Sequence, residues 1–369
     1  MRVLFVCRMF DRVAGGVERM AIALMNDLVE RGHDVSLFTW DRANAQPYYP
    51  MASAIRWHRL DMGDPSRTAN AASRYLRMRR FRSLARAERP DAVVGFQHGP
   101  FLFAALSLVR TGIPVVLSER NAPDQLDHTR AGRHRRAIFV TMRLARAITV
   151  QFEGYVQRYP AFLQARIVPI ANPVYAAKAF AVPNADKAQR VLLSVGRLSY
   201  QKNYSALVRA FALLVPSFPD WQLRIVGDGE ERAALQSLAE SLGIAARVSW
   251  PGAVRDVPVE YRAADLFCMP SRWEGFPNAV AEAMAHGLPV VGFRHCAGMA
   301  ELITPGHNGE LADGNGDPPA LAAALEPLMR DSAARGRMGI EARRIAEVYR
   351  PSKSFDDWEN LLSEVARAS

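Results

Sequence analysis

The chain has 369 residues, of which 49% are hydrophobic, and carries a formal net charge of +10 at pH 7. This length exceeds what one hydrophobic core usually supports, and the composition is that of a globular protein, so we expect two folded domains. The three cysteines, Cys7, Cys268 and Cys296, lie far apart in the sequence. Their spacing argues against a disulfide framework or a zinc knuckle and fits a reducing cytosol.

The excess positive charge lies entirely in the first half of the chain. Residues 1–175 contain 26 Arg, no Lys and 14 acidic residues, a net charge of +12, whereas the remainder has a net charge of −2. Two arginine-rich segments, 74–89 and 128–146, have helical character. Each is either a solvated helix face or a surface for anionic lipid headgroups or a pyrophosphate-linked acceptor, where a basic residue contributes about 1 kcal/mol. Nucleic acid is not expected as a partner because no recognition helix, zinc finger or stacking aromatic pattern accompanies the charge.

Short β-branched runs alternate with helical patterns along the whole chain. The predicted strands of the first half are residues 3–7, 35–39, 92–96, 114–119, 147–151 and 166–170, and those of the second half are 190–196, 221–227, 247–252, 266–270, 289–293 and 309–311. Apolar runs separated by helices are typical of parallel strands covered on both faces. The fold class is therefore α/β, with two doubly wound, Rossmann-like halves that divide near residues 172–190.

The stretch RWEGFPNAVAEAMAHGLPVV, residues 272–291, follows a predicted strand and contains two carboxylates. Pro277 suits the first position of a helix that runs to about His286 and stops at Gly287. Glu274 then lies before the helix and Glu282 within it. The backbone N–H groups of residues 275–279 are expected to form an anion site, with the carboxylates placed to accept hydrogen bonds from sugar hydroxyls on either side. This arrangement predicts a site for a sugar nucleotide.

A second loop supplies the cations that a diphosphate requires. In SVGRLSYQKN, residues 194–203, Arg197 and Lys202 follow a strand and precede a helix. Either residue alone would be interpreted as a solvated or carbonyl-capping side chain. Together on one loop they favour diphosphate binding, in which each charge-assisted contact contributes about 1.5–3 kcal/mol.

Taken together, these motifs resemble the retaining glycosyltransferases of family four. The resemblance rests on GRLSYQKN, on IVGDGEE at 225–231, on EGFPNAVAEAMAHGLPVV and on GGVERMAIALMNDLVERGHDVSLFT at 15–39. Further stretches, VVLSERNAP at 115–123 and ITVQFEGYVQRYP at 148–160, look like the branch that contains bacterial galactosyl and N-acetylgalactosaminyl transferases. The family implies a GT-B fold, in which two facing Rossmann-like domains enclose a cleft.

The resemblance also implies a division of the chain. The amino-terminal, acceptor-binding domain would span 1–172, a linker 173–189, and the carboxyl-terminal, nucleotide-sugar-binding domain 190–350. A last helix, within 351–369 and ending at Ala368, would cross back onto the first domain.

Roles for individual residues follow from the same resemblance. Lys202 and Arg197, with Asn203 on the same loop, would hold the donor diphosphate. Glu282 would bind the ribose hydroxyls, and Glu274 the donor sugar. The remaining residues implied at the site are Gly15 and Gly16 near the donor phosphate or the acceptor, Val254 near the base, Gly275, Phe276 and Pro277 at the donor sugar, and His98 and Glu119 near the reacting sugar. Many relatives have histidine where this chain has Glu119, which leaves the role of that residue open.

The implied reaction is transfer of a hexose or N-acetylhexosamine from a nucleotide sugar, with UDP preferred to GDP, to a polyprenyl-pyrophosphate-linked or saccharide acceptor. No cofactor is expected, and no metal, because the chain lacks an Asp-x-Asp motif and a metal-ligand spacing of histidines. The expected location is the cytoplasm, with the basic first domain on the cytoplasmic face of the inner membrane. A sugar-nucleotide epimerase of the same architecture and a non-catalytic nucleotide-sugar-binding protein are the alternative functions. The VGDGEE stretch has Arg232 where a dinucleotide fingerprint needs glycine, so it is interpreted as a strand-to-helix turn.

Overall fold

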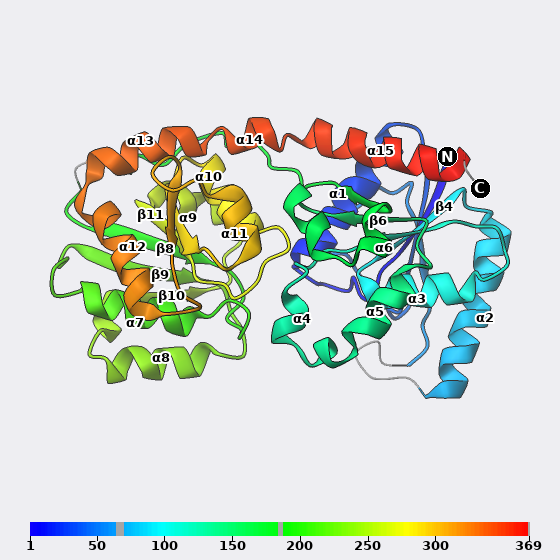
Figure 1. The fold of residues 1–369 in the computed structure, drawn as a ribbon, viewed down its shortest axis with the longest axis horizontal. Helices are drawn as coiled ribbons and strands as arrows, with labels where there is room; N and C mark the ends of the chain where they lie inside the picture. Colours follow the sequence, from blue (N-terminus) through cyan, green and yellow to red (C-terminus); the bar gives the residue numbers. More distant parts are fainter. Residues whose placement is uncertain (64–69, 184–186, 368–369) are drawn as a thin grey trace. The chain divides into compact units, whose positions relative to one another are not determined.

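The computed structural model describes residues 1–63, 70–183 and 187–367. The chain divides into two compact units, one formed by Met1–Pro173 with Ser352–Ser369 and the other by Val174–Pro351. The stretch expected to be a linker, 173–189, is thus grouped with the second unit apart from its first residue, and its residues 184–186 lie outside the described part. Each unit is an α/β structure built on one parallel sheet (Figure 1).

The first unit has a seven-stranded sheet with the order β3-β2-β1-β4-β5-β6-β7. Its strands are β1 (Arg2–Val6), β2 (Asp34–Thr39), β3 (Arg56–Arg59), β4 (Ala92–Phe96), β5 (Val115–Ser118), β6 (Ala147–Val150) and β7 (Ile167–Pro169). Its helices are α1 (Gly16–Glu30), α2 (Ala71–Glu88), α3 (His98–Ser107), α4 (Gln125–His128), η1 (Arg130–His134), α5 (Arg135–Met142), η2 (Glu153–Arg158), α6 (Ala161–Gln164) and α15 (Pro351–Arg367). Val3 aligns with Val35 of β2 and with Ala92 of β4, so the strand order reverses between β1 and β4.

The second unit has a six-stranded sheet with the order β10-β9-β8-β11-β12-β13. Its strands are β8 (Arg190–Val195), β9 (Trp221–Val226), β10 (Val248–Gly252), β11 (Leu266–Met269), β12 (Val290–Phe293) and β13 (Gly309–Ala312). Its helices are α7 (Tyr204–Leu214), α8 (Arg232–Ser241), η3 (Ala245–Arg247), α9 (Val257–Ala263), α10 (Asn278–Ala285), α11 (Ala297–Leu302), α12 (Pro318–Arg330), α13 (Ser332–Ala342) and α14 (Ile345–Val348). Here the strand order reverses between β8 and β11, which are hydrogen-bonded neighbours. In open sheets such reversal points are where ligands bind, beyond the carboxyl ends of the strands.

Both sheets are covered on both faces, as the apolar strand runs predict. In the second unit, α7, α8 and α12 pack with alternate strand residues in one core, while Phe267 of β11 contacts the ring of Tyr261 from α9. In the first unit, α1 packs on one face of the sheet. The last helix, α15, adds Phe355, Trp358 and Leu362 to this same core. Ala368, expected to end that helix, lies outside the described residues.

The predicted strands are all present, and one further strand was missed. β3 has the sequence RWHR and lies at the edge of the first sheet, paired with β2. Its polar residues are accommodated because Arg56 forms ion pairs with Asp34 and Glu88 at the sheet margin. An edge strand of this kind lacks the apolar run by which the buried strands were recognised.

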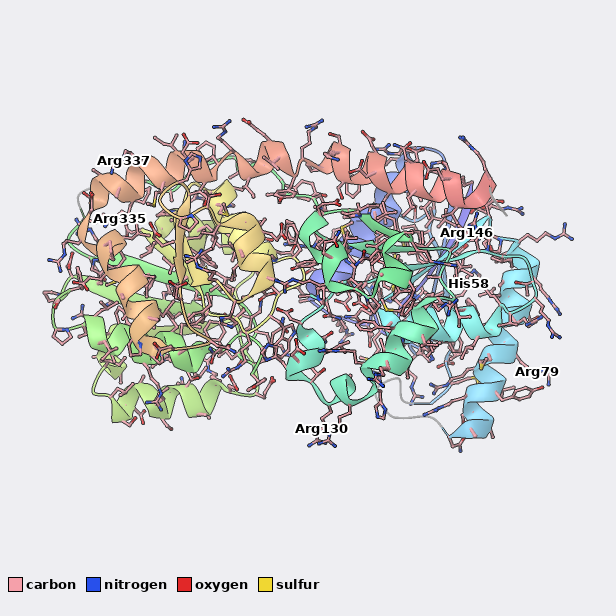
Figure 2. All side chains as sticks on the ribbon, in the orientation of Figure 1. His58, Arg79, Arg130, Arg146, Arg335 and Arg337 are labelled. Carbon is pink, nitrogen blue, oxygen red and sulfur yellow. The ribbon has the colours of Figure 1, made fainter. Side chains whose placement is uncertain are left out.

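The two arginine-rich segments fold differently. Segment 74–89 lies almost entirely in α2, whereas 128–146 is divided among the end of α4, the 3-10 turn η1, and α5. The side chains of Arg79 on α2 and Arg130 on η1 are exposed and extend from the first unit (Figure 2). Among the helices of the described residues, none combines the length and apolarity needed to cross a membrane.

Candidate active site

The loops that follow β8 and β11 carry most of the predicted site residues. Because these strands are adjacent at the reversal point of the second sheet, their loops meet although they are about 70 residues apart in sequence. Nζ of Lys202 lies 2.6 Å from Oε1 of Glu274, and the Ser271 hydroxyl donates to the same carboxylate oxygen at 2.6 Å. The side chains of Lys202 and Glu274 are 18% and 7% exposed. The two residues predicted to serve the phosphate and the sugar therefore form a largely buried ion pair.

Further contacts brace the same two loops. The backbone N–H of Arg272 donates to the carbonyl of Gln201, and the Gln201 amide donates to the carbonyl of Trp273, at 2.8 and 2.9 Å. The Arg272 guanidinium lies 4.4 Å from the centre of the Tyr200 ring and donates to Oδ1 of Asn203 at 2.8 Å. Asn203 is buried, and its backbone is left-handed, with φ 53°. Its hydrogen bond from Arg272 connects the two loops. Sequence analysis missed the parts played by Ser271 and Arg272.

Arg197 does not join the Lys202–Glu274 pair. Its side chain is 76% exposed, and its Nε lies 3.7 Å from Oε2 of the exposed residue Glu230. An exposed ion pair of this length contributes little to stability. The Arg197 side chain is therefore not fixed in the position that joint diphosphate binding with Lys202 requires.

Glu282 lies on α10 and is held by two neighbouring side chains. The phenol of Tyr261 donates to Oε2 of Glu282 at 3.0 Å. His286 Nδ1 lies 2.7 Å from the carbonyl oxygen of Glu282, and its ring lies 5.0 Å from that of Tyr261. His286 thus satisfies a carbonyl in the last turn of the helix, where the chain leaves through Gly287 with φ +82°. In the sequence, His286 marked only the approximate end of the helix, and Tyr261 was not singled out.

The start of α10 differs from the prediction in two respects. Pro277 has ψ 77°, which is not helical, so it precedes the helix and Asn278 is the first helical residue. The N–H of Asn278 donates to the carbonyl of Phe276 at 2.8 Å. The expected anion site on residues 275–279 was therefore wrong in counting that N–H as available.

Gly275, Phe276 and Pro277 are buried. The Phe276 ring packs edge-on against Tyr349, with centroids 5.6 Å apart. Gly298 of α11 approaches the same loop so closely that an added Cβ would lie 2.8 Å from the carbonyl oxygen of Glu274. The loop that carries Glu274 is therefore held by packing on two sides.

Val254 follows β10 at the edge of the sheet, two strands from β8. The VGDGEE stretch forms the turn between β9 and α8, as predicted. A Cβ on Gly227 would meet the carbonyl oxygen of Gly196 at 2.0 Å, and one on Gly229 that of Leu198 at 2.3 Å. These glycines allow the turn to lie against the backbone beside Arg197.

In the first unit, three predicted residues lie around the reversal point between β1 and β4. Gly15 is the N-cap of α1, whose first residue is Gly16, and the loop before them follows β1. His98 begins α3 directly after β4, and its Nε2 lies 2.9 Å from Oγ1 of Thr141. Burial lowers the pKa of His98. The half-buried imidazole is consequently favoured in its neutral form.

Glu119 follows β5, the neighbour of β4, and is 9% exposed. Burial raises the pKa of its carboxyl group, although Oε1 accepts a hydrogen bond from the backbone N–H of Asn121 at 3.1 Å. The next residue, Arg120, is also buried, and burial lowers its pKa to about 10. The Arg120 guanidinium donates to the side-chain oxygen of Asn172. Glu119 and Arg120 are thus a buried acidic and a buried basic residue at the carboxyl edge of the first sheet.

Two family models match the chain, "Glycosyltransferase Family 4" over residues 14–174 and "Glycosyl transferases group 1" over 176–345. A glycosyltransferase of Haemophilus influenzae is 27% identical over 349 residues, which cover 95% of this chain and 96% of that protein. The Campylobacter jejuni GalNAc-α-(1→4)-GalNAc-α-(1→3)-diNAcBac-PP-undecaprenol α-1,4-N-acetyl-D-galactosaminyltransferase is 24% identical over 370 residues, with both chains fully covered.

Solved structures show the same fold. The lipopolysaccharide outer core galactosyltransferase WaaB superposes with a TM-score of 0.74 at 21% identity, covering 99% of each chain. Sucrose-phosphate synthase of Thermosynechococcus elongatus gives a TM-score of 0.80 at 19% identity over the full length of both chains.

Two Rossmann-like parallel-sheet units with these structural neighbours show the GT-B fold. The chain belongs to the family-four type of glycosyltransferases, because the two family models together cover residues 14–174 and 176–345. The family and the fold predicted from the motifs are confirmed.

Proposed function

We propose that the protein transfers a hexose or N-acetylhexosamine from a nucleotide sugar, with UDP as the expected nucleotide, and that the anomeric configuration is retained. The observation that carries this proposal is the 2.6 Å contact between Lys202 and Glu274 at the reversal point between β8 and β11. It sets a cation suited to a diphosphate beside a carboxylate suited to sugar hydroxyls. The two halves of a sugar nucleotide require these two groups side by side.

Donor binding changes the electrostatic partner of Lys202. In the structure, its ammonium is paired with the Glu274 carboxylate. A bound diphosphate adds negative charge next to the lysine, and each charge-assisted contact contributes about 1.5–3 kcal/mol. Arg197, whose side chain is exposed and loosely paired, is free to turn toward the same phosphates. Glu274 then accepts hydrogen bonds from the sugar, and Glu282 from the ribose.

The reaction follows from the charge that develops on the leaving group. The bond between the anomeric carbon and the diphosphate oxygen breaks, and the acceptor oxygen bonds to that carbon on the same face. The proton of the acceptor hydroxyl passes to the leaving phosphate, and the nucleoside diphosphate departs. Positive groups fixed before the reaction stabilise this charge most effectively, and Lys202 is such a group. Arg197 adds its charge once it has turned toward the phosphates, so that no metal ion is required.

The first unit is proposed to bind the acceptor, a lipid-linked or free saccharide. Its support is the net charge of +12 over residues 1–175 and the name of the Campylobacter relative, which specifies an undecaprenol-pyrophosphate acceptor. His98 and Glu119, at the carboxyl edge of the first sheet, are the candidates for contact with the reacting groups.

On α2, Tyr75 and Leu76 are 65% and 50% exposed, and Arg79 and Arg80, one helical turn further along, are also exposed. We assign to this helix face the contact with anionic lipid headgroups on the cytoplasmic side of the inner membrane, because aromatic and aliphatic side chains between cations suit a bilayer interface.

The test is incubation with a panel of UDP- and GDP-sugars, in the presence of EDTA, with lipid-pyrophosphate-linked glycans as acceptors. We expect release of nucleoside diphosphate that increases on addition of acceptor, and a product whose anomeric proton coupling matches that of the donor. Conversion of the donor sugar without acceptor would instead favour an epimerase. Donor binding with no turnover on any acceptor would favour a binding protein.

A further inference from the structure

Tyr261 is a buried phenol that the proposed reaction does not use directly. It lies near the end of α9, with 1% of its surface exposed, and its hydroxyl donates to Oε2 of Glu282 at 3.0 Å. We propose that Tyr261 is a positioning residue, which orients the Glu282 carboxylate toward the two hydroxyls of the donor ribose. This inference rests on the proposed function, in which Glu282 binds that ribose.

The phenol is held firmly, so it can act as a fixed donor. Its ring packs between Phe267 of β11, with centroids 6.0 Å apart, and His286, at 5.0 Å. The preceding residue, Glu260, accepts two hydrogen bonds from Arg224 of β9, at 2.6 and 2.9 Å. This bidentate contact ties α9 to the sheet, whereas the phenol itself is fixed by the two rings that pack against it.

The backbone of Glu282 is also held, by a second side chain. The Glu282 carbonyl can only accept, so Nδ1 of His286 carries the proton in their 2.7 Å contact. The same imidazole packs against the Tyr261 ring. Side chain and backbone of Glu282 are thus fixed by two residues that also contact each other. A glutamate with three rotatable bonds, left alone, would have to be ordered at the moment of binding, at an entropic cost.

The orientation of the Glu282 carboxylate affects the binding of one part of the nucleotide, the ribose. If Tyr261 serves Glu282, its loss reduces the contribution of the ribose hydroxyls and leaves that of the diphosphate intact. A purely structural role would weaken all nucleotides alike. The quantity that separates these cases is the ratio of the Kd of 2′-deoxy-UDP to that of UDP.

Calorimetric titration of UDP and 2′-deoxy-UDP against the full chain measures this ratio in the parent protein and in three variants. We expect a ratio of about 10 in the parent protein, from the loss of one hydrogen bond to a charged group. The ratio should fall to about 3 in Tyr261→Phe and to near 1 in Glu282→Ala. Glu260→Gln weakens the contact of α9 with Arg224 of β9 and leaves the Glu282 carboxylate unaltered. This variant should keep the parent ratio even if the melting temperature drops.

The outcomes are distinguishable. An unchanged ratio in Tyr261→Phe together with its loss in Glu282→Ala would overturn the role of Tyr261 and leave the proposed function standing. Equal weakening of both nucleotides in Tyr261→Phe, or a fall of the ratio in Glu260→Gln, would show a general structural effect and also overturn it. A parent ratio retained in Glu282→Ala would remove the proposed role of Glu282 itself.

Discussion

Lys202 and Glu274 meet at a single oxygen: Nζ lies 2.6 Å from Oε1, the atom to which the Ser271 hydroxyl also donates. Two donors on one carboxylate oxygen orient the plane of the group. The lysine, in turn, is held where a diphosphate can reach it. Each partner therefore has one role toward the ligand and another in positioning its neighbour.

Glu274→Gln separates these roles. The amide keeps the shape of the side chain but loses the charge, so we expect the transfer rate to fall about 100-fold or more, because the sugar loses an ionised acceptor at the reacting centre. The Kd of UDP should stay within about threefold, since UDP lacks the sugar and Lys202 stays in place. Product assays measure the transfer rate, and calorimetry measures the Kd of UDP. Glu230→Gln, at the exposed partner of Arg197, is the matched control and should leave the transfer rate unchanged. Equal losses of rate and of UDP affinity would contradict the assignment of Glu274 to the sugar.

Ser271→Ala removes the second donor from Oε1 of Glu274. Ser271 is fully buried, so no water replaces the hydroxyl easily. A hydrogen bond to a charged group contributes about 1.5–3 kcal/mol, which corresponds to a fall in kcat of about ten- to a hundredfold. Ser205→Ala, a partly buried hydroxyl at the start of α7, is the control. If Ser271→Ala had the same kcat as the parent protein, Lys202 alone would be sufficient to orient the Glu274 carboxylate.

Gly298 should tolerate no side chain. An added Cβ would lie 2.8 Å from the Glu274 carbonyl oxygen and 3.1 Å from the Glu274 Cβ. The first distance is too short for a real contact, so the backbone of Glu274 would have to shift. We expect Gly298→Ala to destabilise the protein by about 1–3 kcal/mol and to lower the transfer rate. Gly99 lies in α3 with nothing within 4 Å of an added Cβ, so Gly99→Ala should be neutral or stabilising by up to about 1 kcal/mol. Urea denaturation measures the stability of both variants. Similar unfolding midpoints for Gly298→Ala and Gly99→Ala would contradict this prediction.

Glu119 gives the stability a specific pH dependence. Burial raises its pKa in the folded state above the value of about 4.3 in an unfolded chain. Its contribution to stability is thus fully present below pH 4 and is lost as the pH rises through the folded pKa. Glu119→Gln removes this loss. The melting temperature of Glu119→Gln minus that of the parent should therefore increase from pH 4 to pH 7, and a difference that decreases over this range would refute the argument.

Membrane contact through α2 is testable with vesicles. Arg79 and Arg80 are both exposed, and each basic residue near an anionic surface contributes about 1 kcal/mol. Reversing both charges, Arg79→Glu with Arg80→Glu, should weaken binding to phosphatidylglycerol vesicles by about tenfold or more. Arg337→Glu on α13 of the second unit, also exposed, is the control (Figure 2). Sedimentation that is equal for the two variants would exclude α2 as the contact surface.

The buried parallel strands were predictable because their apolar runs are dictated by helices on both faces of each sheet. β3 was not, since its sequence RWHR has no apolar run and Arg56 forms its ion pairs at the sheet edge. The boundary at Pro277 was misplaced by one residue because proline's fixed φ suits a helix and the extended residue before it equally well.

In the candidate site, the charged residues could be predicted and their supports could not. Lys202 and Glu274 belong to a recognisable motif, but their direct contact depends on the adjacency of β8 and β11, which sequence spacing does not reveal. Ser271 and Tyr261 are common residue types without a charge or a distinctive spacing. Only the packing of β11 and α9 brings their hydroxyls to the two glutamates.

The central claim is that Lys202 binds the diphosphate of the donor. Calorimetric titration of UDP and UMP in EDTA, against the parent protein and Lys202→Met, tests it most directly. We predict that the parent binds UDP at least about tenfold more tightly than UMP, from one charge-assisted contact to the additional phosphate, and that Lys202→Met binds the two with nearly equal affinity. A Lys202→Met protein that kept the full preference for UDP would contradict the account.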